Sequence, residues 1–145
     1  MENNETVIRN CVNSFVEGDL DRWVSLFTAD ATLEFPGSTE MSGIKLVKDV
    51  VPALKLFMSL FPNGLNLDIE SIIQEGNRAT CELRGKNNTL PNGKEYNNRY
   101  ALIFEFEGGK IKKFREYSDT ALVERVLVPL LSEGAAGENA PSVSH

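Results

Sequence analysis

The clearest pattern along the chain is a pair of alternating apolar and polar runs on either side of a Gly-Gly turn. Residues 96–106 and 111–120 each place Phe, Tyr and Ile among charged residues, and Gly108-Gly109 separates the two runs. Alternation with a period of two is typical of strands that bury one face, and the glycines favour a tight reversal. The pattern predicts a long antiparallel hairpin over residues 96–120.

The first third of the chain shows helical spacing instead. Apolar residues recur three or four positions apart over residues 7–16, 20–27 and 44–58. This spacing predicts three amphipathic helices. Gly18 is expected to end the first helix and Asp19 to cap the second. Pro52 lies inside the third helix, where its missing N–H predicts a kink or a restart.

The remaining segments predict strands and turns. Residues 28–31 are interpreted as a turn, and Thr32–Phe35 as a short strand that ends at a Pro-Gly pair. Residues 65–74 and 77–86 predict two further strands, and a loop over residues 87–94 leads into the hairpin. The chain therefore has helices first and antiparallel strands afterwards.

This order is typical of the α+β class. We expect one domain over residues 1–131, in which three N-terminal helices pack on the concave face of a cone-shaped, curved, mostly antiparallel sheet. Such a cone encloses a pocket between the helices and the sheet. Residues 122–131 are expected to close the domain as a short helix or extended segment. Residues 132–145 are rich in Gly, Ala, Ser and Asn, which predicts a disordered tail.

Composition narrows the classes of function. The 145 residues suit a single domain, and a hydrophobic content of 41% is enough for a core. A net charge of −6 argues against nucleic acid and anionic membranes as partners. No segment has the ~20 consecutive apolar residues of a spanning helix, and the acidic N-terminus does not resemble a signal peptide. We therefore expect a cytoplasmic protein with neither a nucleic-acid nor a membrane partner.

Few residues are available for metal or thiol chemistry. The only histidine is His145, so a buried catalytic His and a multi-His metal site are excluded. Cys11 and Cys81 have no CxxC neighbour and are expected to be two buried free thiols, with a disulfide as the alternative. No phosphate loop or dinucleotide fingerprint is present. We expect neither a metal nor a cofactor.

Glu116 is the residue that most needs an explanation. It lies between Phe114 and Ser118 on one face of the second hairpin strand. Since Phe114 should face the core, the carboxylate of Glu116 should do so as well. Burial of an unpaired charge is costly, so this position suggests a functional group.

Four segments of the sequence resemble one superfamily. They are Gly18-Asp19-Leu20, Leu26 to Pro36, Asn92 to Asn97 and Gly109 to Asp119. These segments resemble the SnoaL-like and ketosteroid-isomerase-like families of the nuclear transport factor two superfamily, with local similarity to limonene-epoxide hydrolase. The resemblance spans roughly residues 5–127. It implies the cone-shaped fold and a homodimer formed through the outer face of the sheet. This fold hosts isomerases, dehydratases, cyclases, epoxide hydrolases and non-catalytic binders.

The resemblance argues against the steroid-isomerase mechanism. The aspartate base of those enzymes corresponds to Phe35 here, their oxyanion tyrosine falls near Cys11, and their second oxyanion acid falls near Leu102. None of these side chains performs the required chemistry.

The epoxide hydrolases of this fold use an Asp-Arg-Asp set. By resemblance, the last aspartate corresponds to Glu116 and the arginine to Arg84, while the first aspartate falls on Lys86. Glu82 would supply the missing carboxylate on the face of Arg84. Such a cluster would keep one carboxylate ionised and the other protonated. The alternative is a structural or solvent-facing salt bridge, because a slip of one residue turns the set outward.

Asn98, Tyr100 and Asp119 are further polar candidates for the site. Asn98, Tyr100 and Leu102 share one face of the first hairpin strand, which the resemblance assigns to the pocket. Tyr100 would donate a hydrogen bond to a developing oxyanion, or would serve as a core aromatic residue. Asn98 would orient a substrate oxygen or a water. Asp119 is a candidate base, or a cap of the turn that follows.

The apolar candidates share a predicted place in the core or the pocket wall. They are Trp23, Phe27, Phe35, Phe57 and Phe114, with Leu102 in the pocket. Glu34 is either a pocket acid or a solvent-facing strand residue.

The sequence predicts a cofactor-independent acid–base enzyme that acts on a hydrophobic, oxygenated small molecule, of the isomerase, cyclase or epoxide-hydrolase type. A biosynthetic role fits this chemistry. The alternatives are a non-catalytic protein that binds a hydrophobic metabolite, and a dimeric interaction module with a filled cone. A pocket with carboxylates of split pKa favours the enzyme, an apolar pocket favours the binder, and no pocket favours the interaction module.

Overall fold

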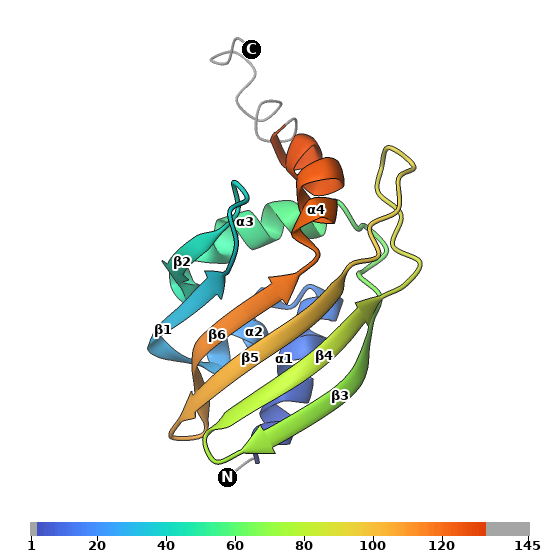
Figure 1. Ribbon diagram of the computed structural model, residues 1–145. Coiled ribbons are helices and arrows are strands. Elements are labelled where there is room, and N and C mark those ends of the chain that lie inside the picture. The colour runs from blue at the N-terminus through green and yellow to red at the C-terminus, as the bar shows by residue number, and fades with distance from the viewer. Residues whose placement is uncertain (1–2, 133–145) are drawn as a thin grey trace.

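The computed structural model describes residues 3–132, which form a six-stranded sheet with helices against it (Figure 1). The helices are α1 (Asn4–Glu17), α2 (Leu20–Ser25), α3 (Val47–Ser59), α4 (Thr120–Leu122) and the π-helical turn η1 (Val123–Leu127). The strands are β1 (Phe27–Phe35), β2 (Gly43–Leu46), β3 (Leu67–Glu75), β4 (Arg78–Gly85), β5 (Arg99–Glu107) and β6 (Lys110–Ser118). The predicted α+β class with a curved sheet is confirmed.

The strand order is β2-β1-β6-β5-β4-β3. Only β1 and β6 pair in parallel, and the other neighbours are antiparallel. Figure 1 shows α1 and α2 behind the sheet, and α3 across the end where β6 leads into α4. The sheet is therefore mostly antiparallel, as predicted, and it is covered on one face.

Helix boundaries follow the local signals in the sequence. The side chain of Asn3 caps α1 by accepting a hydrogen bond from the Thr6 N–H, and Gly18 ends this helix at φ 75°. Glycine is the residue that adopts a left-handed backbone conformation with little cost in conformational energy. Asp19 then caps α2 by accepting from the Arg22 N–H. The predicted stop and cap are both confirmed.

The first strand differs from its prediction. Residues 28–31 do not form a turn but belong to β1, and the register with β6 shifts between Phe27 and Thr32. A bulge absorbs these residues, so the chain bends without leaving the sheet. The short exposed edge strand β2 was not predicted, and α3 starts only at Val47. No restart interrupts α3 at Pro52.

The C-terminal segment is helical. Helix α4, the turn η1 and helical residues 128–132 follow one another without a break. This resolves the predicted choice between a helix and an extended segment. Apart from Ser132, the predicted tail over residues 132–145 lies outside the described residues. None of the helices within residues 3–132 has the length and apolar character that a membrane crossing needs.

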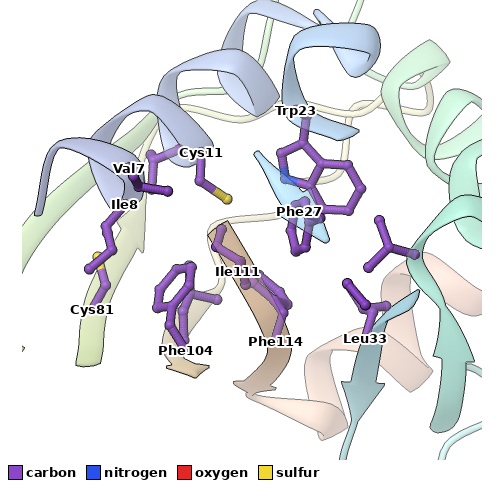
Figure 2. Close-up of a cluster of buried hydrophobic side chains, with 14 of the residues drawn as sticks. Val7, Ile8, Cys11, Trp23, Phe27, Leu33, Cys81, Phe104, Ile111 and Phe114 are labelled. Atoms are coloured by element: carbon purple, nitrogen blue, oxygen red, sulfur yellow. The ribbon is translucent and has the colours of Figure 1, made fainter. Parts of the chain in front are cut away.

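The main core lies between α1, α2 and the inner face of the sheet. Figure 2 shows Phe104, Ile111 and Phe114 of the sheet beneath Ile8, Cys11 and Trp23 of the helices. Phe104 is fully buried and meets Phe114 edge to face at 5.2 Å. Cys11 and Cys81 are both free and buried, as predicted.

A second apolar cluster lies at the other end of the helices. It joins Phe57 of α3 and Phe61 just after this helix to Tyr96 of the loop before β5. Val123 and Leu127 of η1, in the C-terminal helix over residues 120–132, complete the cluster. The two clusters share partly buried neighbours such as Phe15 and Met58. The C-terminal helix is thereby packed onto the domain.

The main core sets the stability of the domain. Phe104→Ala should lower the free energy of unfolding by about 3–5 kcal/mol, because it removes a fully buried ring and leaves a cavity. Urea denaturation followed by circular dichroism measures this change. Ile73→Ala is the matched control, since Ile73 is 67% exposed and should change stability by less than about 0.5 kcal/mol. Equal effects of the two substitutions would contradict the assigned core.

Candidate active site

A cavity of about 260 Å³ opens between the helices and the inner face of the sheet. This volume lies just below the ~300–1,000 Å³ that is usual for ligand pockets, so a small ligand fits best. Residues from both apolar clusters line the cavity. The wall includes the predicted residues Trp23, Phe35, Phe57, Leu102 and Phe114. Phe27 does not reach the cavity and instead packs in the core, with its ring 4.6 Å from that of Trp23.

Two acidic residues within residues 3–132 line the cavity, Glu40 in the connection between β1 and β2 and, on the inner face of the sheet, Glu116. It lies opposite Leu102 of β5, and it shares the inner face of β6 with Phe114 and Ser118. Its carboxyl group lines the cavity, and within residues 3–132 no hydrogen bond or ion pair reaches it. Desolvation by the apolar surroundings raises the pKa of Glu116 from 4.5 to about 7.

A carboxyl group with this pKa can both accept and donate a proton near neutral pH. Efficient acid–base catalysis requires a pKa close to the working pH, because both protonation states are then populated. The shift arises from burial rather than from a partner charge. Charged residues such as Glu40 and Lys45 also line part of this largely apolar wall, and Glu116 is the carboxyl group in it whose pKa burial raises.

Two tyrosine hydroxyls share the cavity with Glu116. Tyr100 pairs with Leu83 on one side and with Ser118 on the other, so it lies one strand period from Leu102 on the inner face. Burial raises the pKa of Tyr100 well above 10 and that of Tyr96 to about 12. Both phenols therefore stay protonated at neutral pH and are available as hydrogen-bond donors.

Cys11 also lines the cavity, but its thiol is not activated. Burial raises the pKa of this thiol to about 12, with smaller effects of Trp23, Cys81 and Glu116. A nucleophilic cysteine requires a lowered pKa. Cys11 is therefore part of the apolar wall.

The predicted cluster of Glu82, Arg84 and Glu116 is wrong. Cys81 and Leu83 occupy the inner face of β4, so the alternation turns Glu82 and Arg84 to the outer face. Glu82 accepts a hydrogen bond from Ser71 Oγ at 2.7 Å. The Nε atom of Arg84 lies 3.5 Å from the carboxylate of Glu70. These contacts agree with the alternative prediction, a solvent-facing salt bridge on the sheet.

The predicted role of Asn98 in the cavity is also contradicted. Asn98 precedes the first residue of β5, so strand alternation does not apply to it, and it is not part of the cavity wall. Its side-chain amide forms hydrogen bonds with the backbone of Arg99 and Asp119 and with the hydroxyl of Tyr96. Glu34 is likewise absent from the wall, whereas its neighbours Leu33 and Phe35 line it.

Asp119 caps a helix rather than facing the cavity. Its Oδ1 atom accepts a hydrogen bond from the Leu122 N–H at 3.2 Å at the start of α4. Asp119 does not line the cavity. The structure thus favours the capping alternative over the catalytic one.

Tyr96 is a cavity residue that the sequence pattern does not reveal. The alternation predicts it at the start of the hairpin, but it lies before β5 in the connection from β4. Its ring packs with Phe57 and Phe61. The only local signal was an aromatic residue beside the Asn-rich segment, which does not indicate where the ring points.

The sequence model of the SnoaL-like domain family matches residues 8–114. Since this match covers more than half of the chain, the protein belongs to the SnoaL-like family. A solved structure described as NTF2-like shares its fold. A search of curated protein sequences gives no match.

Several solved structures share this fold. A protein of unknown function from Burkholderia pseudomallei, described as NTF2-like, is 22% identical with a TM-score of 0.72, covering 88% of this chain and 99% of that chain. A proposed isomerase from Bacillus subtilis is 19% identical with a TM-score of 0.71, and the match covers 81% of this chain and 87% of that chain. IdmH, a proposed polyketide cyclase from Streptomyces antibioticus, is 18% identical with a TM-score of 0.68, and the match covers 83% of this chain and 95% of that chain. At these identities the likeness shows the fold alone.

The raised pKa of Glu116 predicts a pH-dependent cost to stability. Between pH 4.5 and about 7 the unfolded chain releases the proton while the folded protein retains it. The folded state therefore loses stability as the pH rises through this window, and the loss is complete above it. Glu116→Gln removes this loss, so its stability relative to the wild type should increase by about 3 kcal/mol from pH 4 to pH 8.

Urea denaturation at a series of pH values measures this difference. Glu75→Gln, on the exposed end of β3, is the matched surface control and should follow the wild-type profile. A stability difference between Glu116→Gln and the wild type that stays constant with pH would disprove the buried, titrating carboxyl group.

Proposed function

We propose that the protein is a cofactor-independent acid–base enzyme of the isomerase or cyclase type. Its substrate is a small, hydrophobic molecule that carries a carbonyl oxygen. The observation that carries this proposal is the carboxyl group of Glu116, whose pKa burial raises to about 7, in a largely apolar cavity beside protonated tyrosines.

In the proposed reaction, the carboxylate of Glu116 removes a proton from the carbon next to the substrate carbonyl. The C–H electron pair moves into the carbonyl, and an enolate forms. The hydroxyl of Tyr100 donates a hydrogen bond to the enolate oxygen, where negative charge develops. The apolar wall excludes water, which strengthens this hydrogen bond.

Two outcomes complete the reaction. In an isomerisation, Glu116 returns its proton to a different carbon of the same conjugated system. In a cyclisation, the enolate carbon attacks a second carbonyl of the substrate, and the new alkoxide takes up the proton from Glu116. Both outcomes restore the carboxylate and need no further reactant.

Epoxide opening is less well supported than these reactions. It would need the carboxylate–arginine–carboxylate set that the local similarity to limonene-epoxide hydrolase suggested. Glu82 and Arg84 are bound to Ser71 and Glu70 on the outer face instead. The likeness in fold to a proposed isomerase and a proposed polyketide cyclase agrees with enolate chemistry.

A non-catalytic binder of a hydrophobic metabolite is the second candidate. The observation in its favour is that Glu116 has no hydrogen-bonded or charged partner within residues 3–132 to orient it. Such a protein would bind the same class of ligand without turning it over. The kinetic experiment below separates the two candidates.

The catalytic proposal is tested with 2-indanone, a small ketone with acidic α-hydrogens. In D₂O, the wild-type protein should accelerate deuterium uptake at these positions, measured by proton NMR. Glu116→Gln should lower the enzyme-dependent rate by about 10²–10⁴-fold, the usual contribution of a positioned base. The Kd for 2-indanone should change little, because the amide keeps the shape of the carboxyl group.

Glu82→Gln is the control for this experiment. It makes the same chemical change on the outer face and should keep the wild-type rate. Wild-type exchange in Glu116→Gln would rule out its role as the base. Binding of 2-indanone without any accelerated exchange in the wild type would favour the non-catalytic binder.

We further propose that the protein is cytoplasmic and forms a homodimer through the outer face of its sheet. This face presents Tyr117, which is 43% exposed, beside the ion pairs of Glu70 with Arg84 and Arg99. A buried aromatic ring is a common anchor of protein interfaces.

Light scattering at micromolar concentration should give the mass of a dimer. Tyr117→Asp should shift this mass toward the monomer, because it would bury an unpaired carboxylate in the interface. Ile44→Asp, at an exposed position of the edge strand β2, is the control and should leave the mass unchanged. A monomeric wild-type protein would contradict the proposed dimer.

A further inference from the structure

The side-chain amide of Asn98 has an orientation that its neighbours determine. Its Oδ1 atom accepts hydrogen bonds from two backbone N–H groups, those of Arg99 at 2.7 Å and Asp119 at 3.0 Å. Both groups can only donate, so the oxygen must face them. The Nδ2 atom therefore faces the Oη atom of Tyr96 at 3.0 Å and the carbonyl of Asp119 at 3.3 Å. The amide has no freedom to flip.

This orientation determines the hydrogen bond at Tyr96. Since Asn98 donates, the hydroxyl oxygen of Tyr96 must accept, and its own hydrogen has to point elsewhere. Tyr96 is only 3% exposed, and its ring is held against Phe57 and Phe61. The residue also lines the cavity that contains Glu116 and Tyr100. The hydrogen of Tyr96 therefore needs an acceptor other than Asn98, and a ligand oxygen in the cavity can be that acceptor.

We propose that Tyr96 is a second hydrogen-bond donor to the ligand oxygen and determines specificity for it, and that Asn98 is its positioning residue. The identity of the ligand class, a hydrophobic ketone or its enolate, rests on the proposed function. The hydrogen bond itself does not depend on turnover.

Tyr96 and Tyr100 form a pair on this account. Burial raises both pKa values, and a hydrogen bond between the two hydroxyls, in which Tyr100 is the donor, raises the pKa of Tyr100 further and lowers that of Tyr96. When a ligand oxygen takes over the hydrogen that Tyr100 otherwise donates to Tyr96, the two neutral phenols match the two lone pairs of a carbonyl or enolate oxygen. Glu116 influences both tyrosines and lies close to the same point.

Asn98 also connects this donor to the rest of the domain. Its four hydrogen bonds join the segment before β5 to Asp119, which caps α4. The C-terminal helix that follows contributes Val123 and Leu127 to the cavity wall. The position of the Tyr96 hydroxyl and the closure of the cavity therefore depend on one buried amide.

The pair should select ligands by a single oxygen atom. A hydrocarbon of the same shape would leave buried hydroxyls without an acceptor, which a site built for hydrogen bonding rejects. The matched probes are 2-indanone and indane, which share a carbon frame and differ in the carbonyl group. Ligand-detected NMR gives the Kd of each.

The wild-type protein should bind 2-indanone more tightly than indane. Tyr96→Phe should weaken binding of 2-indanone about fivefold and leave binding of indane unchanged, because one neutral hydrogen bond is lost while the ring remains. Tyr117→Phe makes the same change on the outer face and should alter neither Kd. An unchanged preference for the ketone in Tyr96→Phe overturns the proposal, and so does an absence of 2-indanone binding to the wild type.

Asn98→Asp tests the positioning role with a side chain of the same shape. The new carboxylate cannot donate, so the Tyr96 hydroxyl should turn and donate to it, away from the ligand. The preference for 2-indanone should fall to the value in Tyr96→Phe, in a variant shown by circular dichroism to be folded. A folded Asn98→Asp protein with the wild-type preference overturns the role of Asn98. Should it fail to fold, Tyr96→Phe still decides the role of Tyr96.

These measurements use binding alone and fail separately from the proposed catalysis. Loss of the ketone preference in Tyr96→Phe with unchanged deuterium exchange in Glu116→Gln would support Tyr96 and refute Glu116 as the base. The reverse pattern would keep the base and refute the donor.

Discussion

The candidate site depends on the desolvation of one carboxyl group, and the packing of the domain has to offset its cost. Glu116 lies on the inner face of β6 among apolar side chains, and no neighbouring charge within the described residues offsets its burial. Its charged form is therefore penalised at the pH where an ordinary glutamate is ionised. Such a cost is tolerated only where the surrounding packing is strong. Here the fully buried Phe104, Ile8 and Ile111 belong to the core of the same domain and supply this packing.

The cavity exists because two apolar clusters do not merge. The main core fills the space beneath α1 and α2, and the second cluster joins the end of α3 to the C-terminal helix. Residues of both clusters line the gap between them. The C-terminal helix contributes through η1, and π-helical turns are common at functional sites. One end of the cone is thus a packed core, whereas the other end can hold a ligand.

Local signals predicted most of the fold. Gly18 and Asp19 marked a helix end and a helix start, since left-handed backbone and N-terminal caps strongly favour these residue types. Alternation predicted the hairpin of β5 and β6. It failed for residues 28–31, where a bulge keeps polar residues inside a strand, and for β2, whose four exposed residues have no buried face to produce a pattern. Those segments are strands only because β6 and β1 offer backbone partners.

The sequence by itself determined that Glu116 faces inward, because a strand that buries Phe114 must bury every second residue beside it. It could not determine which face of β4 carries Glu82 and Arg84, because one residue of register reverses every side chain of a strand. It also gave no sign that Asn98 would direct the Tyr96 hydroxyl, since that hydrogen bond requires residues 96, 98 and 119 to meet. Periodicity along one strand is local chemistry, whereas the choice of face and the meeting of distant side chains depend on how the whole sheet closes.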